Sequence, residues 1–388
     1  MVATNKPHIL FLGTQMEVAG AQRVLLSQAR WFREKGYTVW AAFLYDKQHL
    51  LKQWQASNPF PIFSLGGRKL GSDPVSNGIR LIGAVFKLYG LLKNGPEIII
   101  SFTPHSNLIG LPVAWLARVP VRIGTVHGQI AGLSNLFTWL HGRLANSKIC
   151  SMMVCVSEQV KEHVSKREHV NLDRLTVIEN GIDLKLFDSF SADRRVQVRE
   201  GLNLPRDGIL FIAVGRLTLE KGHMYLLDAI SQIAPRYPTL RLVVVGDGPL
   251  SARLEIHAQN KHISEKLILV GLRNDVIDLL MSSDIYVQPS LSEGLSLALL
   301  EALGARLPIV ATKIPAFTTV VKDEESALLV PPANAEKLAI ALERLICDDG
   351  LRRRIAESGR ELVKKRYSLA TMCQSYESLI LELTRDVT

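Results

Sequence analysis

The sequence predicts an α/β protein built from two doubly wound parallel sheets. Its 388 residues suggest two domains at roughly 150 residues per domain. Short apolar runs alternate with longer amphipathic stretches along the chain, which is typical of strand–helix units. The apolar runs show no polar alternation, as expected of strands that helices cover on both faces. With 47% hydrophobic and 21% charged residues, intrinsic disorder, coiled coils and collagen-like repeats are poor descriptions of the chain.

Both halves of the chain repeat this alternation, so each half is predicted to form βαβ units. In the first half the predicted strands are His8–Leu12, Thr38–Leu44, Glu97–Ser101, Arg122–Val126 and Met152–Val156. In the second half they are Ile209–Val214, Leu240–Val245, Leu267–Val270, Ile285–Gln288, Ile309–Ala311 and Ala327–Val330.

The domain boundary is predicted in the polar run Asp188–Pro205, which has no convincing apolar period. This gives a first domain at residues 1–190 and a second at 191–366. A last amphipathic stretch within 367–388 either closes the second domain or crosses back to the first, and periodicity leaves both arrangements open.

Charge is distributed unevenly along the chain. Lys and Arg number 46 against 37 Asp and Glu, a net charge of +9. Residues 1–190 hold 21 basic and 12 acidic side chains, whereas 191–388 hold 25 of each, so the whole excess lies in the first half. The first half is therefore expected to meet an anionic partner.

Membrane-spanning and disulfide-rich classes are not expected. No apolar stretch is expected to reach the ~18 to 20 residues of a membrane span, because Pro112, Arg118 and Pro120 interrupt the best candidate. The four cysteines have no CxxC spacing, which argues against a zinc site or a disulfide framework. A reducing cytosol is the expected compartment.

Loops that lead from a strand into a helix are where open α/β sheets bind ligands, because helix N-termini favour phosphate. One such loop, Gly215–Gly222, carries Arg216 and Lys221, two cations five residues apart. Cations so placed can converge on one diphosphate. The first strand-to-helix loop contains Gly20, where a ligand can approach the backbone closely.

A second loop carries two carboxylates eight residues apart, Glu293 and Glu301. They can bracket a diphosphate and hydrogen-bond the hydroxyls on either side, which suits a sugar nucleotide. Glu301 is surrounded by apolar residues, where an unpartnered carboxylate would be costly. The first turn of the helix between the two carboxylates is predicted to consist of Gly294, Leu295 and Ser296.

Together these residues resemble the retaining GT-B glycosyltransferases of glycosyltransferase family 4, over most of the chain. The spacing of Glu293 and Glu301 is the hallmark of that family. The second half also matches at Val214–Gly222, Val245–Pro249, Val270–Gly271 and Pro289–Ala302. The first half matches more loosely at Gly20–Val24, Thr125–Gly128, Val156–Glu158 and Asn180–Asp183.

The resemblance implies two Rossmann-like domains that face each other across a cleft, with the acceptor on the first and the donor on the second. It implies that Arg216 and Lys221 neutralise the donor diphosphate and that Glu293 lies near the hydroxyls of the donor sugar. It implies that His127 faces that sugar and that Glu301 binds the ribose. The remaining donor-binding residues that it implies are Gly20, Gly215, Gly271, Leu272, Arg273, Gly294, Leu295 and Ser296.

The residues themselves support two expectations, a role for His127 and a mechanism without a metal ion. His127 would more often be structural than catalytic, but it follows a predicted strand at the end where a ligand cleft opens. No Asp-x-Asp motif is present to hold a divalent metal, so a metal-free mechanism with no cofactor beside the nucleoside diphosphate sugar is expected. The resemblance implies retention of the anomeric configuration, without a side-chain nucleophile.

The basic first half has two candidate uses. The segments Gly78–Lys93 and Leu133–Lys148 combine apolar side chains with cations, a pattern that can lie in a membrane interface. Alternatively, both are core helices with solvated Lys and Arg on their outer faces. Nucleic acid is not expected as a partner, because no recognised nucleic-acid-binding pattern accompanies the charge.

The function expected from all of this is transfer of a hexose, most consistently from a UDP-sugar, to a glycan acceptor. The expected acceptor is a lipid-linked saccharide of bacterial surface polysaccharide or lipopolysaccharide synthesis, at the inner face of the cytoplasmic membrane. Two alternatives stay open at this point. One is a GT-B epimerase acting on the sugar nucleotide itself, and the other is a non-catalytic sugar-nucleotide-binding protein.

Overall fold

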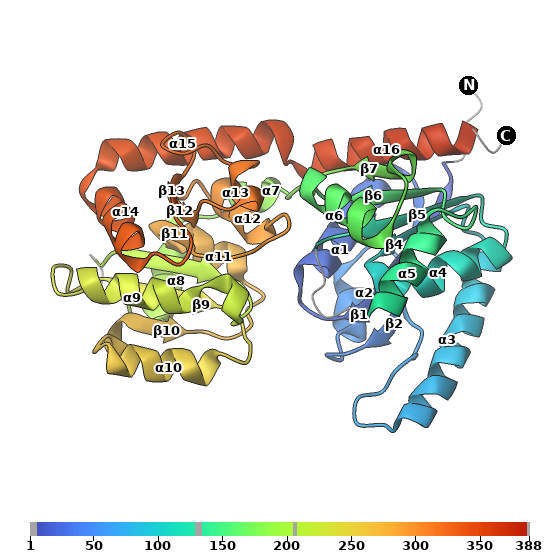
Figure 1. Ribbon diagram of the computed structural model, residues 1–388, viewed down its shortest axis with the longest axis horizontal. Coiled ribbons are helices and arrows are strands. Elements are labelled where there is room, and N and C mark those ends of the chain that lie inside the picture. Colours follow the sequence, from blue (N-terminus) through green and yellow to red (C-terminus); the bar gives the residue numbers. More distant parts are fainter. Residues whose placement is uncertain (1–5, 129–133, 205–207, 386–388) are drawn as a thin grey trace. The chain divides into compact units, whose positions relative to one another are not determined.

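The structure is a computed structural model that describes residues 6–128, 134–204 and 208–385. The chain divides into two compact units, each a parallel sheet with packed helices (Figure 1). The first unit is Met1–Gly181 together with Leu369–Thr388, and the second unit is Ile182–Ser368. The two parallel sheets confirm the predicted α/β class.

In the described part of the first unit, the sheet has seven parallel strands in the order β3-β2-β1-β4-β5-β6-β7. Its strands are β1 (His8–Met16), β2 (Thr38–Asp46), β3 (Ile62–Ser64), β4 (Ile98–Phe102), β5 (Val121–Val126), β6 (Met152–Cys155) and β7 (Leu175–Val177). Its helices are α1 (Gly20–Glu34), α2 (Leu51–Ser57), α3 (Pro74–Lys93), α4 (Pro104–Leu116), α5 (Asn135–Ala145), α6 (Glu158–Glu168), α16 (Leu369–Arg385) and a short 3-10 helix (Leu172–Arg174).

The second unit has six parallel strands among its described residues, in the order β10-β9-β8-β11-β12-β13. They are β8 (Leu210–Val214), β9 (Arg241–Val245), β10 (Leu267–Leu269), β11 (Ile285–Gln288), β12 (Ile309–Thr312) and β13 (Leu328–Val330). Its α-helices are α7 (Lys185–Asp188), α8 (Ala192–Gly201), α9 (His223–Ile233), α10 (Ser251–Asn260), α11 (Val276–Ser282), α12 (Leu297–Gly304), α13 (Pro315–Thr318), α14 (Ala335–Cys347) and α15 (Asp349–Arg366). Two 3-10 turns, Leu219–Lys221 and Ser264–Lys266, complete the unit.

Every predicted strand is present, and its ends agree to within one or two residues in most cases. The central strands are uninterrupted apolar runs because both faces of the sheet are buried; Ile9, for example, pairs with Val39 on one side and Ile98 on the other. Sequence analysis missed β3 and β7, because three-residue strands at the edges of a sheet carry too little apolar pattern to stand out.

Each sheet reverses its strand order at one point, between β1 and β4 in the first unit and between β8 and β11 in the second. Open α/β sheets bind ligands at the carboxyl ends of the strands beside such a reversal. The loops after β8 and β11 are the two that the sequence singled out for their charged residues. The topology therefore brings those two loops to neighbouring positions.

The division between the units lies at Gly181, earlier than the expected boundary at residue 190. The supposedly irregular run contains α8, which sequence analysis missed because polar contacts rather than an apolar stripe attach it. Arg194 donates from Nε and Nη2 to the same oxygen, Oδ2 of Asp278, at 2.9 and 2.6 Å, and Arg195 pairs with Asp284 at 2.6 Å. These ion pairs attach α8 to the α11 region of the second unit.

The last helix, α16, belongs to the first unit, where it packs on α1. Its Glu377 accepts a hydrogen bond from the hydroxyl of Tyr37 at 2.7 Å and pairs with Lys6 at 3.4 Å. The buried side chains Cys373 and Tyr376 lie on the same helix. Of the two arrangements that periodicity left open, the structure has the return to the first unit.

Helix α3 corrects the expectation that no segment is long and apolar enough to span a membrane. Among the described residues, α3 is the one helix that is long and apolar enough to cross a membrane, judged by length and composition alone. Most of it is exposed. The core-helix alternative for this segment is therefore wrong for the outer face of α3, where Ile79 and Phe86 meet solvent.

Candidate active site

The loop between β8 and α9 is shaped by one glycine. Gly222 has a φ of +69°, a conformation that favours glycine, and a Cβ placed there would lie 2.0 Å from the backbone carbonyl oxygen of Pro289. The amide of Leu291 also donates to the carbonyl of Glu220 at 2.7 Å. The loops after β8 and β11 thus touch backbone to backbone, which fixes the side chains on them relative to each other.

Lys221 and Glu293 form the centre of the candidate site in the second unit. The Lys221 Nζ donates to Glu293 Oε1 at 2.6 Å, and both side chains are largely buried. The same carboxylate oxygen accepts hydrogen bonds from Gln288 Nε2 at 3.0 Å and from Ser290 Oγ at 2.9 Å. Such charge-assisted, multiply donated contacts are short and strong, so the position of the carboxylate is well defined.

A buried polar chain extends behind that carboxylate. Gln288 Nε2 also donates to Ser296 Oγ at 2.8 Å, and the Tyr286 hydroxyl donates to Gln288 Oε1 at 3.1 Å. Burial, together with the nearby carboxylates of Glu293 and Glu301, raises the pKa of Tyr286, so the phenol stays protonated. Sequence analysis missed Gln288 and Ser290, although polar residues at the end of an apolar strand were an available signal.

The helix α12 begins later than predicted. Ser296 is extended (φ −79°, ψ 110°) and is the N-cap residue, and its hydroxyl accepts from the Leu299 amide at 3.3 Å. Gly294, Leu295 and Ser296 therefore precede the helix instead of forming its first turn, because a serine oxygen caps free amides best from outside the helix. Glu301 lies on α12 and is buried.

Arg216 and Lys221 have different environments. The Arg216 side chain is 77% exposed, and its guanidinium approaches the Glu220 carboxylate at 4.0 Å. Glu220 accepts a hydrogen bond from the Thr218 hydroxyl at 2.7 Å, and this bond lowers its pKa. Lys221 is thus pre-positioned by Glu293, whereas Arg216 reaches into solvent and is held only loosely.

The loop after β10 contains the three residues expected to meet the nucleotide base. Gly271 has a φ of +65°, and its carbonyl accepts from the Gly246 amide at 2.9 Å, which ties this loop to the one after β9. Leu272 is exposed. Arg273 binds Asp275 through two contacts of 2.7 and 2.6 Å, so its guanidinium is held by a neighbour rather than extended freely.

In the first unit, His127 follows β5 directly. Its Nε2 lies 2.9 Å from the Thr125 hydroxyl, and its ring stacks on Phe102 with 5.0 Å between centroids. Burial lowers its pKa to about 4, so the imidazole is neutral at physiological pH. Its Nδ1 is buried and hydrogen-bonds no residue in the part of the chain that the structure describes. A neutral imidazole with one uncommitted nitrogen can hydrogen-bond a substrate.

Next to His127, the strand-order reversal of the first unit holds a residue that sequence analysis missed. Thr103 adopts φ +81° and ψ 150° just before α4, which is a strained conformation for a β-branched residue. Its hydroxyl lies 2.8 Å from that of Thr14, across the reversal point between β1 and β4. Gly20 is the first residue of α1, and Ala19 before it offers no side-chain cap. No sequence pattern signals a strained threonine.

A second histidine gives a pH prediction for the fold. His223 begins α9 and is buried, and burial followed by the charge of Lys221 lowers its pKa to about 4. An unfolded histidine titrates near 6.5, so below that pH the unfolded chain binds a proton that the folded chain does not. Stability is therefore lost as the pH falls from 6.5 towards 4.

We expect the His223→Asn variant to lose less stability than the wild type between pH 7 and pH 5. The difference should be about 2 kcal/mol in unfolding free energy, because only about 1.5 units of the displacement between pKa 6.5 and about 4 lie above pH 5, and each unit contributes about 1.36 kcal/mol. Urea denaturation at the two pH values measures it. The exposed His49→Asn variant is the control and should follow the wild type, and an unchanged pH dependence in His223→Asn would count against this explanation.

Two parallel sheets of Rossmann type, each with polar residues at its strand-order reversal, define a two-domain α/β protein of the nucleotide-binding kind. Residues 18–186 match the family model for Glycosyltransferase Family 4, and residues 195–362 match the one for glycosyl transferases group 1. The chain belongs to this group 1, family 4 family of GT-B glycosyltransferases.

Curated relatives and solved structures agree with this membership. The chain is 28% identical over 316 residues to the UDP-Gal:alpha-D-GlcNAc-diphosphoundecaprenol alpha-1,3-galactosyltransferase of Escherichia coli, covering 79% of this chain and 80% of the relative. It is 24% identical to the capsular polysaccharide biosynthesis glycosyltransferase CapM of Staphylococcus aureus, covering 74% and 77%. Anabaena HepE in complex with UDP-glucose has the same fold, with a TM-score of 0.83, 20% identity, and coverage of 97% and 99%.

Proposed function

We propose that this glycosyltransferase moves a hexose from a UDP-sugar to a lipid-linked glycan acceptor, with retention of the anomeric configuration. The observation that carries the proposal is the Lys221–Glu293 pair, held at 2.6 Å beside the strand-order reversal of the second unit. The galactosyltransferase relative, whose name specifies UDP-Gal and a diphosphoundecaprenol acceptor, supports the choice of donor and acceptor class. The proposed location is the cytoplasm, at the inner face of the membrane.

Lys221 would stabilise the leaving group. One of its three N–H donors is bound to Glu293, and the others can bind the diphosphate oxygens as negative charge develops on them. A fixed cation at that place acts on the transition state more than on the ground state, because it is already oriented. Arg216, which is exposed, would close onto the same diphosphate, while Glu301 on α12 would bind the ribose hydroxyls.

Glu293 and His127 would act on the donor sugar. Glu293 can accept hydrogen bonds from sugar hydroxyls in addition to those it accepts from the protein. The neutral His127 can bind a sugar hydroxyl without bringing a competing positive charge to the diphosphate. Both residues position the substrate, and neither is asked to become a covalent nucleophile.

The proposed step needs no side-chain nucleophile. The acceptor hydroxyl oxygen forms a bond to the anomeric carbon on the face from which the nucleoside diphosphate leaves. The bond between the anomeric carbon and the β-phosphate oxygen breaks, and that oxygen receives the acceptor's proton. The products are the new glycoside, of unchanged anomeric configuration, and the nucleoside diphosphate.

Nucleotide binding is the direct test of the donor assignment. We expect UDP to raise the melting temperature more than GDP or ADP, because a ligand that binds only the folded state stabilises it according to its concentration relative to its Kd. Glu301→Ala should remove most of that shift, and the exposed Glu325→Ala in the same unit should retain it. A larger shift with GDP or ADP would replace the donor, and no shift with any nucleotide would contradict the site.

Metal removal tests the charge-stabilising role of the two cations. We expect sugar transfer to continue at an undiminished rate in excess EDTA, since Lys221 and Arg216 supply the positive charge that a divalent ion would otherwise provide. Initial rates with and without EDTA, followed by addition of Mn²⁺, measure this. Complete loss of activity that Mn²⁺ restores would contradict the metal-free mechanism.

A further inference from the structure

Helix α3 exposes a continuous apolar stripe. Val75, Ile79, Ile82 and Phe86 follow one another at spacings of four, three and four residues, so they share one helix face. Each is between 59% and 73% exposed. Large apolar side chains scattered singly on a surface need no explanation, but an aligned row of them marks an interaction site.

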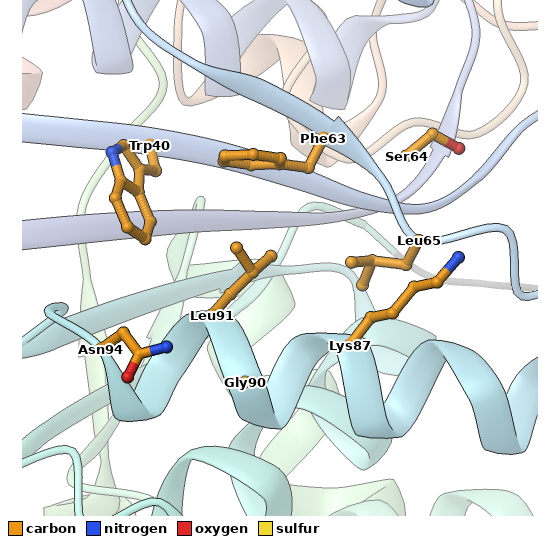
Figure 2. Close-up of a pocket in the computed structure, with 8 residues that line it drawn as sticks. All are labelled: Trp40, Phe63, Ser64, Leu65, Lys87, Gly90, Leu91 and Asn94. Carbon is orange, nitrogen blue, oxygen red and sulfur yellow. The ribbon is translucent and has the colours of Figure 1, made fainter.

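The opposite face of α3 packs against the rest of the described first unit. Its buried residues, Ala84, Leu88 and Leu92, recur every four positions. Beside this attachment, an apolar pocket of about 370 Å³ separates α3 from the strands β2 and β3, with Trp40 and Phe63 on the strand side (Figure 2). Figure 1 shows the N-terminal part of α3 extending past the other elements of this unit. The helix thus protrudes, with its stripe turned away from the buried side.

The two helices next in sequence also expose apolar side chains. Trp115 and Leu116, at the end of α4, are about half exposed or more. On α5, Leu136 and Trp139 are exposed, and the Arg143 guanidinium lies 5.9 Å from the centre of the Trp139 ring. Helix α4 contacts both α3 and α5. Tryptophan with adjacent cations is typical of membrane–water interfaces.

This part of the chain also carries most of the excess positive charge. From residue 68 to 148 there are nine Lys and Arg but only two acidic residues. Arg80, Lys87 and Lys93 lie on α3 itself. A partner for an apolar stripe flanked by cations must be apolar and anionic together, which describes a bilayer containing acidic phospholipids. A second copy of the chain is disfavoured, because it would bring two cationic surfaces together.

We propose that α3 binds the surface of an anionic lipid bilayer as an interfacial helix, with Ile79, Ile82 and Phe86 inserted at the headgroup level. The helix lies on the membrane and does not span it, since its other face is packed against the protein through Ala84, Leu88 and Leu92. The inference does not depend on the donor or the reaction proposed above. It would bring the enzyme to the surface that contains a lipid-linked acceptor.

The stripe is tested by co-sedimentation of the full chain with vesicles. We expect binding to vesicles of phosphatidylglycerol and phosphatidylethanolamine, and a loss of at least tenfold in partition coefficient for Ile79→Ser/Ile82→Ser/Phe86→Ser. The control Ile256→Ser/Ile340→Ser removes exposed apolar side chains from α10 and α14 of the second unit and should bind like the wild type. All three proteins should keep the same UDP-induced thermal shift, which separates this test from that of the proposed function.

The charge is tested with Arg80→Gln/Lys87→Gln/Lys93→Gln. Each cation near an anionic surface is worth about a fivefold change in affinity, so we expect a loss of about a hundredfold that high salt reproduces in the wild type. Three results would overturn the proposal: no binding of the wild type to anionic vesicles, equal binding by the stripe variant, or a wild-type dimer that the stripe variant dissociates while vesicle binding is unchanged. Resistance of bound protein to carbonate extraction would overturn the interfacial placement.

Discussion

Replacing Lys221 with alanine is expected to lower the rate of sugar transfer by about a hundredfold to a thousandfold. That is the range for removal of one fixed group that stabilises developing negative charge in a site of this kind. Glu293 would lose its cation but keep the hydrogen bonds from Gln288 and Ser290, so the fold should be retained. Steady-state rates, with circular dichroism on the same samples, measure both effects.

The matched control for this prediction is Lys322→Ala, which removes an exposed lysine of the same unit. It should transfer sugar at the wild-type rate. Arg216→Ala should fall between the two, because Arg216 is exposed and has a weaker hold on its position. Full activity in a correctly folded Lys221→Ala variant would remove the leaving-group role assigned to this residue.

Gly222→Ala is expected to cost the second unit about 3 to 5 kcal/mol of unfolding free energy. The new Cβ would lie 2.0 Å from the Pro289 carbonyl oxygen, and the φ of +69° adds strain for any residue with a side chain. Because the atom it meets is backbone, the two loops must separate for the side chain to fit. Urea or thermal denaturation measures the loss, and donor binding should weaken with it.

Gly271→Ala isolates the steric part of this effect. Gly271 has nearly the same φ, +65°, but a Cβ there meets no atom within 4 Å in the described structure. It should therefore cost only the backbone strain, about 1 kcal/mol. Equal losses in the two variants would show that the contact between the two loops is not what requires glycine at position 222.

The sheets were predictable because burial on both faces leaves an unbroken apolar run, which sequence shows directly. The same logic explains the failures. Edge strands such as β3 and β7 are too short to show the pattern. Helix α8 shows no apolar pattern because Arg194 and Arg195 attach it through ion pairs with Asp278 and Asp284. Its contacts are polar and distant in sequence, so no local periodicity reports them.

Sequence analysis proposed a set of candidate site residues but could not propose the contacts among them. Sequence spacing identified Arg216, Lys221, Glu293 and Glu301, and the structure places all four in the second unit. It did not show that Lys221 pairs with Glu293, across 72 positions of the chain, while Arg216 extends into solvent. The difference between the environments of Lys221 and Arg216 depends on a backbone contact between the two loops.

The sequence by itself determined the α/β class, the positions of the strands other than β3 and β7, the charged residues of the two loops and the family that they resemble. Those properties are local, since each depends on residues within one strand, loop or helix. Only the tertiary structure decided which cation is buried, that α16 returns to the first unit, that Thr103 is strained, and that one face of α3 is left uncovered. Each of these depends on which segments meet in space, because burial, pairing and exposure are properties of the packed chain.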